Sequence, residues 1–315
     1  MKIGIPPFGD YTQIIQEFAS YLGWELVMPA VTDRTIELGN KHLASELMCL
    51  PAKSTLGSMI EACELGATDL IMFDACGLCR QKAYWILQQR AVRRLGYNAT
   101  VHPVRLGLMT PKDICAVDPS VSYWKAWQAF IKLVRWIFKQ EKEIVSVPTD
   151  GNQVRIGIVG EIYTVLEPAV NKNLIKKLEK LGASVHNFLT LSYFISKKFH
   201  LKGWLNSKDR ELMKVAEKRS HKYFPKDIGG HGNEAITFAI YYALKGFNGV
   251  IHLLPFPCMP EATISPVLDD ISRDYGIPVM RFIFDTHAAE AGLDTRLEAF
   301  VDILQRRKKR KEKRW

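Results

Sequence analysis

The 315-residue sequence contains no apolar run near the roughly 20 residues that a membrane-spanning helix needs. Its start, MKIGIPPFGD, also lacks the hydrophobic stretch and small-residue cleavage site of a signal peptide. These absences predict a cytoplasmic protein, in which the six cysteines are reduced thiols, metal ligands or buried small side chains rather than disulphides. With 47% apolar residues the chain can bury a large core, and its length favours two domains.

Excess positive charge is scarce outside one short segment. The residues from Arg306 to Trp315 include eight basic residues and one acidic residue, and so carry +7 of the formal net charge of +10. The remaining +3 is too little for a general nucleic-acid surface, so we expect no specific nucleic-acid partner. The segment is interpreted as a solvated extension of the last helix, with a contact to membrane or RNA as the alternative.

Two pairs of similar segments indicate an internally duplicated chain. The strand-like segment Lys2–Ile5 reappears at Arg155–Val159, and each is followed by a predicted helix, 11–22 and 168–181 respectively, that ends at a glycine. Segments 66–79 and 246–260 both run from a glycine through an apolar strand to a cysteine-bearing loop. Continuous apolar strands that alternate with helices are typical of parallel sheets covered on both faces. The sequence therefore predicts an α/β protein of two Rossmann-like α/β/α domains.

The predicted domain boundary is the turn-forming cluster 149–152. It separates an N-terminal domain (1–150) from a C-terminal domain (151–303), which is followed by the basic tail (304–315). An amphipathic helix over 120–142 precedes the boundary, and its apolar stripe is predicted to pack against the protein's own core. The stripe consists of Trp124, Trp127, Phe130, Ile131, Val134, Ile137 and Phe138. A subunit interface or a membrane surface is the alternative for these side chains.

Three cysteines follow predicted strands, in the region where functional groups gather in open parallel sheets. Cys76 and Cys79 form a C-x-x-C pair after the strand Leu70–Phe73, and Cys258 follows the strand Val250–Leu254. If the two domains face one another, these thiols share the cleft between them.

Cys49 and Cys258 each occur as C-x-P at the start of a predicted helix. Proline is favoured in the first turn, which leaves each cysteine near the cap, where free N–H groups and the helix dipole stabilise a thiolate. A thiolate is the form that binds metal. Cys63 and Cys115, which lack this arrangement, are interpreted as buried structural thiols.

The C-x-x-C pair has three uses to distinguish. A thiol oxidoreductase would use only Cys76 and Cys79 and would leave Cys49 and Cys258 without a role. Structural zinc normally needs two close pairs, but the sequence has no second C-x-x-C and no H-x-x-x-H. An iron–sulphur cluster accepts three or four cysteines from widely separated segments, so this spacing favours a cluster and leaves the role of Cys76 open.

Seven segments match a known family and occur in the order expected for it: MKIGIP, ELMCLPAKSTLG, CGLCRQKAYW, VRIGIVGEIY, IGGHGNEA, GFNGVIHLLPFPCMPEA and TRLEAFVD. Together, up to about residue 303, they resemble the acyl-CoA dehydratase activase-related proteins. These are relatives of the D-component (beta subunit) of 2-hydroxyacyl-CoA dehydratases and of the double-cubane-cluster proteins. Residue by residue, the resemblance implies Cys49, Cys79 and Cys258 as cluster ligands, with Cys76 as an additional thiol where related chains often have a small residue.

The resemblance also implies an oxygen-sensitive protein with a 4Fe-4S or larger double-cubane cluster in the cleft between its domains. Electrons of low potential would come from a separate activase with an actin-like ATPase fold, and the acceptor would be a small molecule or an acyl-CoA. A homodimer or heterodimer is expected. The chain has no G-x-x-x-x-G-K-[ST] loop, so ATP hydrolysis is expected in the partner. A non-catalytic cluster carrier or scaffold is the alternative.

Four further residues are candidates for the site. His231 and Glu234 lie in the loop before a predicted helix and suit an acid/base pair, or else a helix cap with a structural histidine. The loop matches G-x-G-x-x-A without a preceding strand, so we expect no dinucleotide there. Arg80 suits contact with the negative charge of a cluster or substrate, or a surface ion pair, and Lys53 has the same two readings.

Overall fold

The computed structural model describes residues 1–43, 45, 47–74, 79–104, 109–144, 151, 153–199, 206–286 and 290–312. The chain divides into two compact units, unit 1 (Met1–Gln140) and unit 2 (Glu141–Trp315). This division falls within the long helix α6 (Tyr123–Ile144). Of the predicted boundary cluster, 149–152, only Gly151 lies among the described residues. In the described ranges, no helix is both long enough and apolar enough to span a bilayer.

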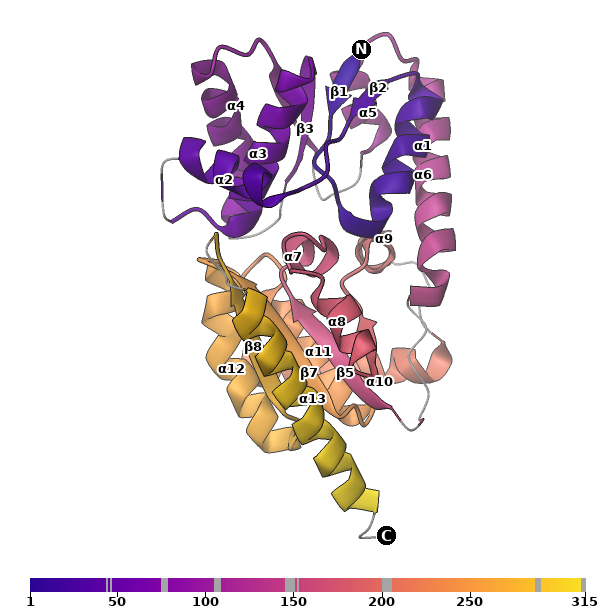
Figure 1. The fold of residues 1–315 in the computed structure, drawn as a ribbon. Coiled ribbons are helices and arrows are strands. Elements are labelled where there is room, and N and C mark those ends of the chain that lie inside the picture. Colours follow the sequence, from indigo (N-terminus) through magenta and orange to yellow (C-terminus); the bar gives the residue numbers. More distant parts are fainter. Residues whose placement is uncertain are drawn as a thin grey trace. The chain divides into compact units, whose positions relative to one another are not determined.

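Unit 1 contains a four-stranded parallel sheet in the order β2-β1-β3-β4. The strands are β1 (Lys2–Gly4), β2 (Glu25–Val27), β3 (Asp69–Phe73) and β4 (Thr100–Val104). The helices are η1 (Gly9–Tyr11), α1 (Thr12–Leu22), α2 (Asp33–His42), α3 (Leu50–Glu64), η2 (Arg80–Ala83), α4 (Tyr84–Arg94), α5 (Pro111–Val117) and most of α6. Helices α2, α3 and α4 cover one face of the sheet, and α1 and α6 lie on the other (Figure 1).

Unit 2 contains a second parallel sheet in the order β6-β5-β7-β8. The strands are β5 (Val154–Gly160), β6 (Ala183–Asn187), β7 (Gly249–Pro255) and β8 (Val279–Phe284). The helices are α7 (Ile162–Leu166), α8 (Leu174–Lys180), α9 (Leu191–Phe199), α10 (Ser207–Tyr223), α11 (Gly232–Leu244), α12 (Met259–Tyr275) and α13 (Glu290–Glu312). In each unit the order across the sheet is second, first, third and fourth strand. This shared order confirms the predicted pair of Rossmann-like α/β/α domains.

In each unit, one helix just before the third strand is buried along most of its length. Every residue of α3 from Leu50 to Cys63 is buried, and so is α11 from Ala235 to Tyr242. A glycine in the first strand allows this close packing: a Cβ on Gly4 would lie 2.8 Å from the Ala62 Cβ, and one on Gly157 would lie 2.2 Å from the Tyr242 ring. The glycine in the first strand of each unit therefore allows the equivalent helix to pack closely against the sheet in both units.

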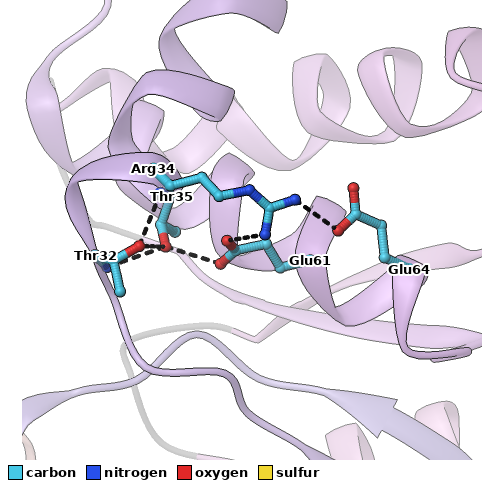
Figure 2. A network of polar contacts seen from close by, with 5 residues as sticks. All are labelled: Thr32, Arg34, Thr35, Glu61 and Glu64. Carbon is cyan, nitrogen blue, oxygen red and sulfur yellow. Dashed lines mark hydrogen bonds and ion pairs between the residues drawn. The ribbon is translucent and has the colours of Figure 1, made fainter.

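Helices α2 and α3 cross with their backbones in contact, beside the polar network drawn in Figure 2. A Cβ on Gly57 would lie 1.8 Å from the Thr35 carbonyl oxygen, so only glycine fits at this crossing. Beside it the Thr35 hydroxyl donates to the buried Glu61 carboxylate at 2.8 Å, and Arg34 pairs with Glu61 at 3.5 Å and with Glu64 at 3.3 Å. The hydroxyl and the guanidinium together compensate the burial of Glu61.

Two predictions about helices in these units were wrong. The predicted helix 168–181 is limited to α8, because Lys172 and Asn173 have positive φ values of 55° and 57°, which a right-handed helix cannot include. The predicted stripe of α6 is also not the packed face: Ile137 is buried, but Trp124 is 73% and Trp127 40% exposed. The buried positions, at near-helical spacing, are Ala126, Ala129, Leu133 and Ile137, so two small alanines take the place of the tryptophans.

The basic end of the chain continues the last helix. Helix α13 runs through the basic residues as far as Glu312. Within it Arg307 donates to the Gly276 carbonyl at 3.0 Å, and Lys308 donates to the Gln153 carbonyl at 2.9 Å. Part of the basic segment is therefore bonded to the protein rather than only solvated.

Candidate functional site

The strand order of each sheet indicates where a ligand would bind, namely at the carboxyl ends of the strands. In unit 1 the chain turns in opposite directions after β1 and after β3, and in unit 2 after β5 and after β7. Loops that leave the carboxyl ends of such adjacent strands diverge and create the crevice in which open α/β sheets bind ligands. The segments that follow β3 and β7 carry Cys79 and Cys258.

Cys49 is the N-cap residue of α3, as the C-x-P pattern predicted. Its backbone is extended (φ −68°, ψ 157°), and Pro51 occupies the first turn of the helix. A helix that connects parallel strands runs antiparallel to them, so the beginning of α3 lies at the carboxyl edge of the sheet. Cys49 is buried there, and Lys53, one turn further along, is buried as well.

Cys79 is the N-cap residue of the short helix η2, after β3 (φ −64°, ψ 130°), and Arg80 is the first residue of η2. Both residues lie near Tyr84, the first residue of α4. The Tyr84 hydroxyl is 3.3 Å from the Cys49 sulfur. Burial and the charge on Cys49 raise the pKa of Tyr84 well above its usual value, Arg80 opposes the rise, and Cys79 adds to it. Three predicted site residues of unit 1 are thus grouped around one phenol.

Cys258 occupies the matching position in unit 2. It is the N-cap residue of α12 (φ −76°, ψ 114°), with Pro260 in the first turn, and it is buried. Its N–H donates to the carbonyl of Pro255, the last residue of β7, at 2.6 Å. This bond makes the turn between strand and helix tight, so the thiol remains close to the carboxyl end of β7.

The predicted glycine-rich loop lies against the helix that Cys258 caps. His231 is the N-cap residue of α11, and a Cβ on the next residue, Gly232, would lie 3.4 Å from the Pro260 carbonyl oxygen and 3.2 Å from Ile264. The absence of side-chain atoms on Gly232 lets α11 approach the start of α12. The loop and Cys258 therefore belong to one region of unit 2.

His231 and Glu234 have different partners in this region. The His231 ring packs edge-on against Phe194, with ring centroids 5.1 Å apart, whereas Glu234 forms an ion pair with Lys197 at 2.6 Å. Burial alone would lower the pKa of Lys197, but the Glu234 carboxylate outweighs it and raises that pKa. Glu234 is thus held as a charge partner of Lys197, and the acid/base pair of the two residues stays a prediction.

The remaining cysteines differ from the helix caps. Cys63 lies inside α3, where burial and the neighbouring Glu64 raise the pKa of its thiol to about 11. Cys115, in α5, donates to the Val121 carbonyl at 3.5 Å. A raised pKa keeps Cys63 protonated, which agrees with a structural thiol.

Sequence reasoning missed a buried polar pair next to Cys258. The Nε2 atom of His252, in β7, is 2.8 Å from the Oε2 atom of Glu261, in the first turn of α12, and both side chains are at most 1% exposed. Their other polar atoms, Nδ1 and Oε1, have no hydrogen-bond partner among the described residues. A histidine within the apolar run VIHLLP was the sequence signal, because an imidazole in a buried strand needs a polar partner.

In the described ranges, no three His, Cys, Asp or Glu side chains are close enough together to hold a metal ion. Cys76 lies outside those ranges. Neither a protein-family model nor a curated protein matches this chain.

Proposed function

We propose that this chain is an iron–sulphur redox protein that accepts low-potential electrons from an ATP-dependent activase and delivers them to a small molecule or an acyl-CoA. The observation that supports the proposal is the placement of Cys49, Cys79 and Cys258. Each is the N-cap residue of a helix at the carboxyl edge of a parallel sheet. The helix dipole and free N–H groups at such caps stabilise the thiolate form that binds iron.

The chemistry of these residues fits a cluster. Cys49 and Cys79 come from separate segments of unit 1, and both lie near Tyr84. Cys258, the N-cap residue of α12 in unit 2, is the further ligand that the family resemblance implies. Clusters are commonly held by thiolates from distant segments, and three or four are sufficient. Arg80 would balance the negative charge of thiolates and inorganic sulphide. When bound, the cluster would supply one-electron transfer between the activase and the acceptor.

His231 and Glu234, the other predicted site residues, would act near the acceptor, together with the Lys197 that pairs with Glu234. Lys197, whose ammonium is paired with Glu234, lies beside the start of α11 and suits an anionic or carbonyl group of the acceptor. His231 caps the same helix and is proposed to exchange protons there. A cytoplasmic location, a dimeric assembly and the separate actin-like ATPase complete the proposal.

Anaerobic purification, followed by iron and acid-labile sulphide analysis, tests the cluster. We expect both elements in the wild-type protein, and severe loss of both on Cys49→Ser, Cys79→Ser or Cys258→Ser. Cys115→Ser is the matched control, because Cys115 caps no helix, and it should keep the wild-type content. A reconstituted wild-type protein without labile sulphide, or zinc bound independently of Cys49 and Cys258, would contradict the proposal.

A second experiment separates a reductase from a cluster carrier. The loaded protein, its activase and ATP are mixed with candidate acceptors, and acceptor reduction is measured. We expect ATP-dependent reduction with many turnovers per protein. Transfer of the intact cluster to an apo-acceptor, without catalytic turnover, would favour the carrier instead.

A further inference from the structure

The contact between Tyr84 and Cys49 joins the two cysteine-bearing segments of unit 1. The phenol oxygen is 3.3 Å from the sulfur, within hydrogen-bond range for sulfur, and both side chains are buried in the same apolar cluster. Tyr84 begins α4, five residues after Cys79, whereas Cys49 caps α3. In such surroundings a tyrosine hydroxyl without a partner is costly, so the sulfur is the group that satisfies it.

We propose that Tyr84 is a positioning residue whose hydroxyl donates a hydrogen bond to the Cys49 sulfur. Chemistry assigns this direction. A phenol hydroxyl is a good donor, whereas a thiol is a weak one and a metal-bound sulfur has no proton to donate.

A second hydrogen-bonded contact joins α4 to α3 without involving Tyr84. One turn further along α4, the buried Gln88 donates to the Thr55 hydroxyl of α3 at 2.8 Å, and Thr55 donates to the Pro51 carbonyl at 2.8 Å. These bonds hold α4 against α3 through residues that do not touch the sulfur. Gln88 therefore offers a control that disturbs the same helix pair without removing the bond to Cys49.

The bond has two consequences. In the metal-free protein it stabilises the Cys49 thiolate, since hydrogen bonds to ionised groups are stronger than neutral ones. In the loaded protein, hydrogen bonds to cluster sulfurs are among the factors that set the reduction potential, so loss of the bond should lower the potential. The second consequence rests on the proposed function, whereas the first does not.

The first test uses the metal-free full-length protein. Cys49 alkylation by iodoacetamide at neutral pH is followed by mass spectrometry of its peptide in wild type, Tyr84→Phe and Gln88→Met. We expect the rate to fall about tenfold in Tyr84→Phe, equivalent to about 1.4 kcal/mol, and to stay within about twofold of wild type in Gln88→Met. An unchanged rate in Tyr84→Phe, or an equal fall in Gln88→Met, overturns the proposal.

A spectroscopic test covers the case in which Tyr84→Phe does not fold. Ultraviolet resonance Raman spectra report through the tyrosine ring doublet whether a phenol donates or accepts a hydrogen bond. The difference between wild type and Cys49→Ala should show one tyrosine losing donor character. A difference that shows loss of acceptor character, or no change, overturns the assignment.

The third test uses the loaded protein. Redox titration followed by electron paramagnetic resonance should give a lower midpoint potential in Tyr84→Phe than in wild type, and an unchanged one in Gln88→Met. An unchanged potential in Tyr84→Phe shows that the bond does not act on the metal. If no iron binds to wild type, the proposed function fails, and the alkylation and Raman results still decide the role of Tyr84.

Discussion

The two units have the same strand order but different side chains at equivalent positions. The helix before the third strand begins with Cys49 in unit 1 and with His231 in unit 2, and each is the N-cap residue. After the third strand, the N-cap residues are Cys79 and Cys258. One scaffold thus presents two sulfur atoms in unit 1, and one sulfur and one imidazole in unit 2. In the proposed function, unit 1 would supply thiolate ligands, and unit 2 would supply one thiolate together with an imidazole for proton exchange.

The interior of the third strand also differs. Gly66 and Gly246, both with positive φ, end the equivalent helices, and counting from them aligns Met72 of β3 with His252 of β7. Met72 is an apolar core residue, whereas His252 forms the buried pair with Glu261. Because unit 1 has an apolar residue at this position, the fold itself does not require the polar pair that unit 2 contains.

The neighbouring helix is attached differently in each unit. In unit 1 a glycine contact brings α2 onto α3, beside the Thr35–Glu61 hydrogen bond (Figure 2). In unit 2 the buried Asp209 of α10 accepts from the Tyr241 hydroxyl at 2.7 Å and from Lys245 at 2.5 Å, both next to or within α11. Close backbone contact at Gly57 brings the neighbouring helix onto α3 in unit 1, whereas the hydrogen bonds of Asp209 attach α10 to α11 in unit 2.

The largest effect is expected at the pair that only unit 2 has. His252→Met or Glu261→Leu alone leaves a buried polar partner, and each should lower the free energy of unfolding by about 3 kcal/mol or more. The double substitution, which imitates Met72, should cost much less than the sum of the two. Native-state hydrogen exchange in α12 measures the three variants. Additive losses would show that the two residues do not depend on each other.

The next effect is expected at the α2–α3 crossing. Gly57→Ala places a Cβ 1.8 Å from the Thr35 carbonyl, and since that atom is backbone the two helices must separate. We expect a loss of about 3 kcal/mol in the stability of unit 1. Hydrogen exchange should accelerate in α2 and α3 and remain unchanged in α11. Faster exchange in both units would show that they do not unfold independently.

A smaller, pH-dependent effect is expected at Asp209. Burial alone would raise the pKa of Asp209, but hydrogen bonds from Lys245, Tyr241 and Asn206 lower it below its usual value. The stability from this carboxylate is therefore complete above its unfolded pKa, about 3.9, and is lost as pH falls through the lower folded value. Asp209→Asn should cost unit 2 about 2 kcal/mol at pH 7.

Urea unfolding at several pH values checks this prediction. The difference between wild type and Asp209→Asn should be constant from neutral pH down to about pH 4 and should decrease below it. A difference that grows on acidification would contradict the assigned sign of the pKa change.

The smallest effect is a gain. Gly292 lies in α13, and a Cβ there would meet nothing within 4 Å. Gly292→Ala should raise the stability of unit 2 by about 0.5–1 kcal/mol, because alanine favours the helix and restricts the unfolded chain. Thermal unfolding measures this change. A loss of stability would mean that space alone does not distinguish this glycine from Gly57.

The sequence predicted most of what depends on local pattern. Cys49 and Cys258 are helix caps because proline in the first turn of a helix is a local preference, and the structure has both caps. The apolar strands were recognised for the same kind of reason, since a strand buried on both faces has few polar residues. The predicted helix 168–181 failed at Lys172 and Asn173, whose backbone conformation no apolar period reveals.

Other features depend on how distant segments pack. The stripe of α6 was assigned to the wrong face because Ala126 and Ala129 give a weaker hydrophobic signal than tryptophan, yet their small size suits a close helix contact. Tyr84 was missed because its partner, Cys49, is 35 residues away along the chain. Glu61 and Asp209 resemble surface acids in the sequence, and only their contacts explain their burial.

By itself, the sequence determined the duplicated α/β architecture and the cysteines at helix starts, because strand burial and helix capping are properties of neighbouring residues. Only the tertiary structure decided which groups lie next to those cysteines: Tyr84 beside Cys49, and the His252–Glu261 pair, which joins β7 to the helix that Cys258 caps. The physical reason is that hydrogen bonds and burial act between side chains brought together by packing, whatever their separation along the chain.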